Sequence, residues 1–442
     1  MKILYVTHYD SNNIKLLSGT IYHVRRMLEE QGHEIIVLDN IKIPIIYYKA
    51  MKALSKVTKK KTLVERSPFF LKYIARQIEK RTVGMDYDLV FSPSSLYYAY
   101  YKDKKPMVFY TDATFGGMLN YYFSEKSCYS WAVKNAMNQE RLALKNADLA
   151  IYASQWAVDT AVKFHQADEK KCVVVNRGAN IKHKLSKEEI YSLIDQREAF
   201  IERKKCTFMF LGTDWKRKGG PFAVEITKIL NEKFGVESKI TIIGCNPQIS
   251  QEDMKYVDII GYLDKSKKSE YEKLENTFKK ANFFLLPSRS EAQGISYTEA
   301  CSWGVPVIAS NTGGVSGIVK DGVNGFLMSE KSTAQEYAER IYDTIITPDE
   351  YRTLSKATFE YCISNLTWSE VGKKINKELY KAKALDLRLF KCVMSIRHFV
   401  HLKYNNLEKA HSEVVIKNCI KLPDLVYHRN FSYCSNISLM NG

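Results

Sequence analysis

The chain has 442 residues, which is too many for one ordinary domain, so two or three domains are expected. A formal charge of +17 at pH 7 indicates an anionic partner, either a phospholipid, a nucleic acid or a phosphorylated substrate, although many of the basic residues serve only to solvate the surface. The sequence has no apolar run of 18 residues, no secretory leader pattern and no Cys-x-x-Cys pair among its nine cysteines; a transmembrane helix, secretion and a zinc site are therefore not expected, and a cytoplasmic location is.

The first predicted elements have the strand–helix–strand order of a nucleotide-binding unit. Short apolar strands are expected over Lys2 to Thr7 and Glu34 to Leu38, and Thr20 to Gln31 has apolar residues at helical spacing. Gly19 directly precedes this helix. The unit lacks the Gly-x-Gly-x-x-Gly fingerprint of dinucleotide-binding proteins, so these residues alone do not separate a ligand-binding glycine from a simple turn glycine.

The most basic part of the chain follows, over residues 49–81. It holds eleven lysines and arginines against two acidic residues, a net charge of +9, and large apolar side chains such as Leu54, Phe69 and Tyr73 are interleaved with them. Basic residues mixed with apolar ones suit an anionic membrane surface. Nucleic-acid binding and a merely solvated helix face are the alternatives that the composition leaves open.

Four further strands complete the first predicted sheet. They are expected over Asp88 to Phe91, Met107 to Thr111, Ala147 to Tyr152 and Cys172 to Val175. Asp112 follows the second of them, where its carboxylate could orient an acceptor hydroxyl or assist its deprotonation, or could simply cap the next segment. The polar, charged stretch from Lys184 to Lys205 is interpreted as a linker between two domains.

The second half opens with a predicted strand, Thr207 to Leu211, and a glycine-containing loop with Arg217 and Lys218, before a helix over Phe222 to Phe234. A lysine in a loop is usually only solvated. Its position after a strand and before a helix N-terminus favours contact with an anionic ligand, because the helix end also attracts negative charge. The guanidinium of Arg217 would suit a bidentate phosphate contact.

Residues 283–328 carry the densest group of motifs. A buried strand, a polar turn, a helix from about Ser296 to Trp303 and a second strand predict a parallel βαβ unit. The helix N-terminus favours a phosphate. Glu291 lies before the helix and Glu299 within it, and carboxylates accept hydrogen bonds from sugar hydroxyls. Ser296 as N-cap and Glu299 also fit a capping box, so Glu299 could be a capping residue only.

This stretch resembles the donor-sugar signature of retaining glycosyltransferases of family four, the glycosyl transferases group 1, which have the GT-B fold. The family carries Glu-x7-Glu, a helix of small residues, Gly-x-Pro-Val and a Gly-Gly turn. The chain has these residues in order, as Glu291, Glu299, Ala300, Gly304, Pro306, Val307, Gly313 and Gly314. The resemblance implies an α/β architecture of two Rossmann-like domains whose parallel sheets face a central cleft.

The resemblance also implies roles for particular residues. Glu291 would hold hydroxyls of the donor sugar, and Glu299 would hold the ribose of the nucleotide. Gly19 would approach the donor diphosphate from the first domain. The backbone N–H groups of three consecutive residues would face the sugar and the phosphate: Gln293, Gly294 and Ile295.

The sequence departs from the family pattern at two places that bear on these roles. Lys218 matches a family lysine that grips the diphosphate, but Thr213 stands where the family has an arginine, so Arg217 is the nearest substitute. The family often has a histidine beside the reacting sugar. Thr111 and Asp112 occupy that strand end here, which makes Asp112 the candidate on the acceptor side.

The predicted domains are residues 1–200 on the acceptor side, 205–365 around the nucleotide-sugar donor, and a helix over 366–384 that crosses back to the first domain. Four large side chains of this last segment are spaced for one helix face: Trp368, Val371, Ile375 and Leu379. Residues 385–442 fall outside the resemblance and are interpreted as an appendage of unknown role.

The hypothesis from the sequence is a retaining, metal-independent hexosyltransferase without a cofactor. It would move a sugar from a nucleotide-sugar donor to a glycan or lipid-linked acceptor, in cell-surface polysaccharide or glycolipid synthesis. It would act in the cytoplasm, or peripherally at the inner face of the cell membrane through residues 49–81. Three alternatives stay open: a non-catalytic GT-B-fold protein that binds a sugar or nucleotide, a different nucleotide-sugar enzyme on the same fold, and a nucleic-acid-binding protein, which rests on charge alone.

Overall fold

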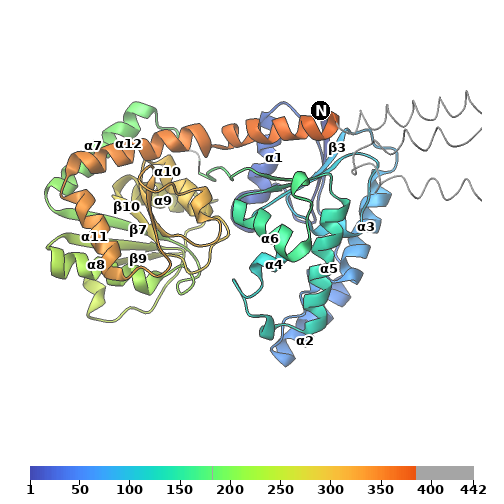
Figure 1. Cartoon of the computed structure of the whole chain (residues 1–442), viewed down its shortest axis with the longest axis horizontal. Helices are drawn as coiled ribbons and strands as arrows, with labels where there is room; N and C mark the ends of the chain where they lie inside the picture. Colours follow the sequence, from blue (N-terminus) through green and yellow to red (C-terminus); the bar gives the residue numbers. More distant parts are fainter. Residues whose placement is uncertain (182, 385–442) are drawn as a thin grey trace, which may run out of the picture. The chain divides into compact units, whose positions relative to one another are not determined.

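The computed structural model describes residues 1–181 and 183–384. Residues Met1–Leu379 form one compact unit. The first unit contains two six-stranded sheets, and every pair of neighbouring strands in both sheets is parallel (Figure 1). The predicted α/β class with two parallel sheets is therefore confirmed.

The first sheet has the strand order β2-β1-β3-β4-β5-β6. Its strands are β1 (Lys2–Val6), β2 (Glu34–Leu38), β3 (Leu89–Ser92), β4 (Met107–Thr111), β5 (Leu149–Tyr152) and β6 (Cys172–Val174). The helices of this part are α1 (Thr20–Glu30), α2 (Ile45–Thr58), α3 (Pro68–Thr82), α4 (Phe115–Met118), α5 (Ser130–Asn146) and α6 (Gln155–His165). All side chains of β3 and β5 are buried, as expected for inner strands of a parallel sheet with helices on both faces.

The second sheet has the order β12-β11-β10-β7-β8-β9. Its strands are β7 (Lys205–Leu211), β8 (Glu237–Ile243), β9 (Val257–Gly261), β10 (Phe283–Leu286), β11 (Val307–Ser310) and β12 (Gly325–Met328). The helices are α7 (Lys187–Glu202), α8 (Gly220–Phe234), α9 (Lys268–Lys280), α10 (Ile295–Ser302), α11 (Ala334–Ile345) and α12 (Pro348–Asn365). Helix α8 packs against α11, and α7 packs against α12, as Figure 1 also shows.

The segment predicted as a linker, Lys184 to Lys205, is instead mostly helix α7. Ser186 and Glu189 form a capping box at its N-terminus. Ile190, Ile194 and Ile201 are buried in the core of the second sheet. The prediction of a linker was wrong because the many charged residues of this stretch obscured an apolar stripe at helical spacing.

A last helix spans residues 368–384, and its predicted buried face is confirmed. Trp368, Val371, Ile375 and Leu379 are each at most 5% exposed. The indole Nε1 of Trp368 donates to Asn180 Oδ1 at 2.9 Å. The predicted domain boundaries remain predictions, and the appendage predicted over 385–442 lies outside the described residues.

The topology decides where a ligand site can form. All strands of a parallel sheet end at the same edge, so the loops that follow them gather there. Asp112 follows β4, Lys218 lies between β7 and α8, and Glu291 lies between β10 and α10. Strands β7 and β10 are neighbours in the second sheet, and this brings the loops of Lys218 and Glu291 together.

Candidate functional site

A pocket of about 580 Å³ lies at these strand ends, with residues of both sheets' loops in its lining. Eight of the nine predicted site residues line it: Asp112, Arg217, Lys218, Glu291, Gln293, Gly294, Ile295 and Glu299. The exception is Gly19, although its neighbours Ser18 and Thr20 are part of the wall. The structure thus gathers residues that are up to 187 positions apart in the sequence, while their roles remain predictions.

Glu291 is at the centre of the charged part of the pocket. Its Oε2 atom forms an ion pair with Lys218 Nζ, and Arg217 Nη1 lies 3.6 Å from the same oxygen. The side chains of Glu291 and Lys218 are only 9% and 12% exposed, so water screens their charges weakly. The predicted sugar-binding carboxylate and the predicted diphosphate-binding lysine therefore neutralise one another.

Arg217, predicted as a phosphate cation, is also held by neighbouring protein groups. Its Nη1 donates to Ser290 O at 2.7 Å and its Nε to Asp214 Oδ2 at 3.3 Å. Its guanidinium lies 5.1 Å from the ring centroid of Tyr122. These contacts connect the loop before α8 to the loop before α10. Arg217 therefore holds Glu291 in position and also places a positive charge near its carboxylate.

Helix α10 begins differently from the prediction. Gly294, with φ +82°, occupies the N-cap position, and no side chain caps the helix. The predicted N-cap at Ser296 and its capping box with Glu299 were therefore wrong, since Ser296 is already inside the helix. A Cβ atom at Gly294 would lie 2.4 Å from the ring of Tyr297, so only glycine fits this close turn.

Glu299 has an ion-pair partner that the sequence analysis missed. The Glu299 side chain is 2% exposed, and the Oε1 atom lies 2.5 Å from Lys265 Nζ. Lys265 comes from the loop after β9 and lines the pocket. The signal available in the sequence was the position of this lysine shortly after a run with Val257, Ile259 and Ile260, which is typical of a strand; the same argument identified Lys218.

A second missed residue, Arg177, faces Asp112. Arg177 Nη1 lies 2.8 Å from Asp112 Oδ2, and both residues line the pocket. The Arg177 side chain is 9% exposed and that of Asp112 is 41% exposed, so the carboxylate reaches solvent while its partner is buried. The arginine therefore fixes the orientation of a carboxylate that remains accessible from the pocket.

Gly19 forms the N-cap of α1, with φ +83°. Leu17 and Ser18 before it also have positive φ angles, 49° and 56°. Left-handed backbone at non-glycine residues is costly and is concentrated at ligand-binding sites. Leu17 and Ser18 line the pocket and Gly19 does not. The two residues with strained backbone therefore border the pocket, and Gly19 lies behind them at the start of α1.

Two tyrosines after α4 contact the loop that contains Glu291, and nothing in the sequence marked them. Tyr121 Oη accepts from the Glu291 N–H at 2.9 Å, and Tyr122 Oη accepts from the Ala292 N–H at 2.5 Å. Tyr121 Oη also shares a hydrogen bond of 2.8 Å with Thr312 Oγ1. Burial raises the pKa of Tyr121 and of Tyr122, so both hydroxyls stay protonated at neutral pH.

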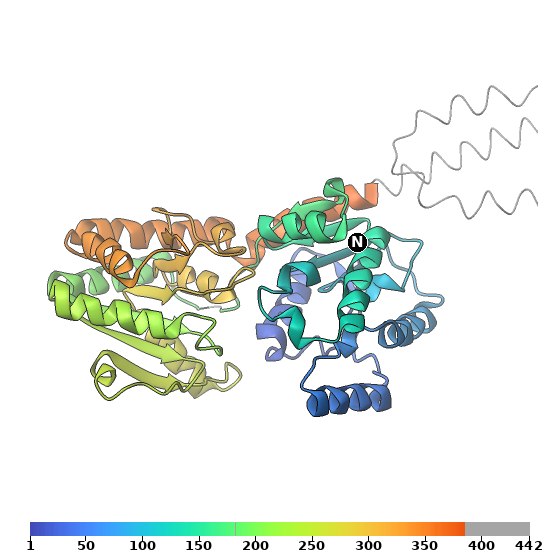
Figure 2. The same ribbon diagram turned by 60° about the horizontal axis from the view of Figure 1, so that its bottom comes forward.

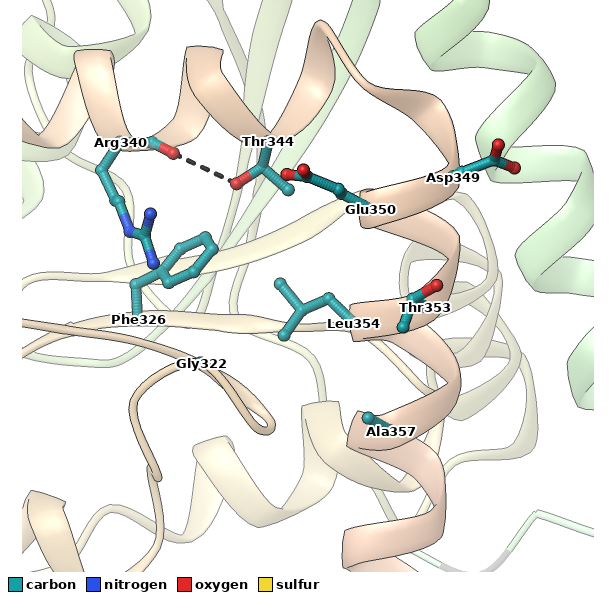
Figure 3. Close-up of a pocket in the computed structure, with 9 residues that line it drawn as sticks. All are labelled: Gly322, Phe326, Arg340, Thr344, Asp349, Glu350, Thr353, Leu354 and Ala357. Carbon is teal, nitrogen blue, oxygen red and sulfur yellow. Dashed lines mark hydrogen bonds between the residues drawn. The ribbon is translucent and has the colours of Figure 1, made fainter.

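Another pocket, of about 370 Å³, lies between α11, α12 and the turn before β12 (Figure 3). The guanidinium of Arg340 lies over the ring of Phe326 there, 4.2 Å from its centroid. Thr344 Oγ1 donates to Arg340 O at 3.2 Å. None of the predicted site residues lines this pocket, and the candidate site is therefore the one at the strand ends.

The sequence model of the family "Glycosyl transferases group 1" matches residues 193–361. These residues include Lys218, Glu291 and Glu299 with the loops that carry them. Residues 193–361 are a group 1 glycosyltransferase domain. The resemblance is thus confirmed, and the two carboxylates of its signature, Glu291 and Glu299, line the pocket at the strand ends.

Relatives and solved structures agree with this assignment. The chain is 23% identical over 276 residues to an uncharacterised glycosyltransferase of Methanocaldococcus jannaschii, an alignment that covers 58% of the chain and 73% of that protein. A crystal structure of Anabaena HepE in complex with UDP superposes with a TM-score of 0.55 at 15% identity, over 86% of the chain and all of HepE. Sucrose-phosphate synthase from Thermosynechococcus elongatus superposes with a TM-score of 0.60 at 17% identity, over 87% of the chain and 99% of the synthase. At these identities the structural likeness shows the fold, which is GT-B.

The described residues contain neither a metal-binding cluster nor a membrane-spanning helix. Over residues 1–181 and 183–384, no three His, Cys, Asp or Glu side chains are grouped so that they could hold a metal ion. In the same part of the chain, every helix is too short or too polar to cross a membrane.

Proposed function

We propose that the protein transfers a sugar from a nucleotide-sugar donor to an acceptor hydroxyl, with retention of configuration at the anomeric carbon. The observation that carries the proposal is the pocket at the strand ends. It combines five cationic side chains, two buried carboxylates and a helix N-terminus, and a donor with a diphosphate and two sugar rings requires groups of these kinds. The resemblance of the Glu-x7-Glu signature supports retention.

Donor binding would replace the ion pair between Lys218 and Glu291. The diphosphate takes Lys218 as its cation, and Glu291 is released to accept hydrogen bonds from sugar hydroxyls. Charge develops on the diphosphate as the glycosidic bond breaks. Lys218 and the N-terminus of α10, at Gly294, stabilise that charge without reorganising, because both are fixed before the reaction. Glu299, with Lys265 beside it, takes the ribose hydroxyls.

Asp112 is proposed to act on the acceptor. Its carboxylate is oriented by Arg177 and is accessible from the pocket. It is suited to receive the hydrogen bond of the incoming hydroxyl and to assist its deprotonation. The six cysteines of the described part of the chain are free thiols, which supports a reducing, cytoplasmic location.

A uridine nucleotide is the first donor to test, since HepE was crystallised with UDP and with UDP-glucose. The test is a thermal-shift screen of the purified protein with UDP, GDP, ADP and their common sugars, with and without EDTA. A ligand that binds the folded state raises the melting temperature by mass action. We expect a shift for one nucleotide that EDTA leaves unchanged, because cationic side chains are proposed to bind the diphosphate.

Matched variants make the screen specific to the pocket. Lys218→Ala and Glu299→Ala are expected to abolish the nucleotide shift, whereas Lys239→Ala and Asp258→Ala, which remove an exposed surface ion pair, are expected to keep it. No shift with any nucleotide in a folded sample would favour a degenerate, non-catalytic site. Donor hydrolysis that does not depend on an acceptor would favour a different nucleotide-sugar enzyme. The anomeric coupling in the product NMR spectrum tests retention.

The acceptor is proposed to be a glycan or a lipid-linked sugar of the cell surface. The basic segment 49–81 supports a lipid-linked acceptor, since such a substrate lies at an anionic membrane surface.

A further inference from the structure

Helix α2 (Ile45–Thr58) is attached to the first sheet through one side only. None of its residues is buried. The half-buried residues Tyr47, Tyr48 and Met51 pack against the core of the first sheet, and half-buried Leu54 lies on the same side of the helix. The opposite side is open to solvent along the whole helix. Figure 2 shows α2, in dark blue, at the margin of the part that contains the first sheet, apart from the strands.

The open side carries an apolar stripe. Ile46 and Val57 are 84% and 81% exposed, although both are large aliphatic residues. Ala50 and Ala53 lie between them and are exposed as well. Positions 46, 50, 53 and 57 fall on one line along a helix. Single exposed aliphatic residues are ordinary, but a stripe that spans a whole helix indicates a surface that contacts something apolar.

A basic stripe runs beside the apolar one. Lys49, Lys52 and Lys56 are exposed and are spaced by three and four residues, so they lie roughly a quarter turn from the apolar line. No acidic residue occurs between Asp39 and Glu65, and three more lysines follow at positions 59–61. The partner must therefore combine an apolar interior with a negatively charged surface.

Neighbouring α3 (Pro68–Thr82) extends the same character. Phe69 is 55% exposed and Tyr73, one turn later, is 39% exposed. The rings of Tyr47 and Phe69 are in contact, with centroids 4.6 Å apart, so the exposed start of α3 lies beside α2. Aromatic rings with one wet and one apolar side are typical of the membrane–water interface.

The position of α2 in the topology links it to the candidate site. The helix follows β2, so it leaves the first sheet at the carboxyl edge of the strands. Asp112 follows β4 at the same edge. The residue proposed to act on the acceptor and the exposed helix therefore belong to one side of the sheet.

We infer that α2 is an interfacial helix that docks the protein on a bilayer with anionic lipids. Ile46, Ala50, Ala53 and Val57 enter the headgroup region, and Lys49, Lys52 and Lys56 pair with lipid phosphates. With 14 residues the helix is about 21 Å long, too short to span a bilayer, so it lies in the plane of the interface. Docking of α2 on a bilayer does not require the proposed function. Only the further statement that the acceptor is carried by a lipid of that bilayer rests on it.

The two rival occupants fit the surface less well. A nucleic acid would satisfy the lysines but would leave the apolar stripe in contact with phosphates or water. A second copy of the chain would bring two lysine stripes of like charge together, which is unfavourable. An anionic bilayer satisfies both stripes at once.

The experiment is co-sedimentation of the full-length protein with vesicles of phosphatidylcholine alone or with phosphatidylglycerol at 30 mol%, at low and high salt. We expect binding to the anionic vesicles that weakens with salt. Lys49→Glu/Lys52→Glu/Lys56→Glu is expected to lower the partition coefficient at least about a hundredfold, since each lysine near the surface contributes about a factor of five. Ile46→Ser/Val57→Ser is expected to lower it at least about tenfold.

Charge-matched and apolar-matched controls are available elsewhere in the chain. Lys102→Glu/Lys104→Glu/Lys105→Glu changes three exposed lysines by the same total charge, and Ile346→Ser replaces an aliphatic residue that is 57% exposed. Both are expected to keep most of the binding. Because no residue of α2 is buried, the test variants should fold, and circular dichroism and the nucleotide thermal shift check this.

The outcomes separate the inference from the proposed function. The docking of α2 would be overturned if the protein did not bind anionic vesicles. It would also be overturned if the α2 variants and the control variants lowered the binding equally. Binding of RNA through the α2 lysines without vesicle binding would overturn it as well. A protein that docks through α2 but shifts with no nucleotide supports the inference while the proposed function fails. A nucleotide-induced thermal shift without vesicle binding supports the proposed function and overturns the docking of α2.

Discussion

Glu291 meets two cations from one loop, and this determines how the site tolerates substitution. Lys218 pairs directly with its carboxylate, and Arg217 lies 3.6 Å away while its own hydrogen bonds go to Ser290 and Asp214. Lys218 is thus the partner that can move to a ligand, and Arg217 is the partner that stays. A carboxylate that is 9% exposed depends strongly on at least one of them.

Lys218→Met is expected to lower the free energy of unfolding by about 3 kcal/mol, because it leaves the buried Glu291 carboxylate without its direct partner. The double variant Lys218→Met/Glu291→Gln is expected to recover most of this loss, since a neutral amide needs no counter-charge. Denaturant unfolding measures both. Losses that simply add in the double variant would contradict the pairing. Neither variant is expected to bind the nucleotide, because both lack Lys218.

Gly294→Ala is expected to abolish the nucleotide-induced thermal shift, because the new Cβ would lie 2.4 Å from the ring of Tyr297 and displace the start of α10. Gly32→Ala is the matched control. Gly32 has a similar φ of +79°, but a Cβ there would meet no atom within 4 Å. Both variants share the backbone strain of about 1 kcal/mol. Equal effects on nucleotide binding would show that the close contact with Tyr297 is unimportant.

At the residue scale, the sequence predicted those site residues that belong to a spaced motif or follow a strand. Lys218, Glu291 and Glu299 all line the pocket. Arg177 and the tyrosine hydroxyls were missed, because their contacts join residues 65 and 170 positions apart and no local pattern encodes such a pairing.

At the element scale, α7 shows why charge content is a poor guide to linkers. Its buried stripe also includes Arg197, whose guanidinium donates to Ala281 O at 3.1 Å and Trp303 O at 2.9 Å. Burial lowers the pKa of this arginine, but the two carbonyl groups satisfy its charge. A residue that looked like surface charge in the sequence therefore joins α7 to the two loops that precede β10 and β11.

Ser186→Ala is expected to destabilise the protein by about 1 kcal/mol, because it removes the capping box that begins α7. Ser192→Ala, at an exposed position inside the same helix, is the control and should be neutral or slightly stabilising, since alanine is the better helix former. Chemical unfolding monitored by circular dichroism measures both. Equal effects would show that the N-terminus of α7 does not depend on its cap.

At the scale of the whole molecule, the order of strands and helices was predictable because buried parallel strands are continuous apolar runs. The sequence could not predict which loops meet, since pairing of strands as distant as β7 and β10 is decided by the sheet order. The same global packing places three histidines, His8, His33 and His165, in surroundings where burial lowers their pKa, to about 4 for His8.

Acid should therefore destabilise the protein. A histidine whose pKa is lower in the folded state is protonated first in the unfolded state, so its stabilisation is complete above about pH 6.5 and is lost as the pH falls toward 4. His8 alone accounts for at most about 3 kcal/mol. Urea unfolding at pH 7 and pH 5 should show a smaller difference for His8→Gln than for the wild type. Identical pH dependence would exclude a contribution from His8.

The tyrosine pair after α4 restricts how such an enzyme can be recombined. Two backbone amides of the loop before α10, those of Glu291 and Ala292, are satisfied by hydroxyls that come from the opposite half of the sequence. A chimera that joined this second half to the first half of a relative with phenylalanines at both positions would leave two amides unpaired, at about 1–3 kcal/mol each. Exchange of the first half of the chain between relatives is therefore expected to succeed only when the Tyr121–Tyr122 segment stays together with the second half that it supports.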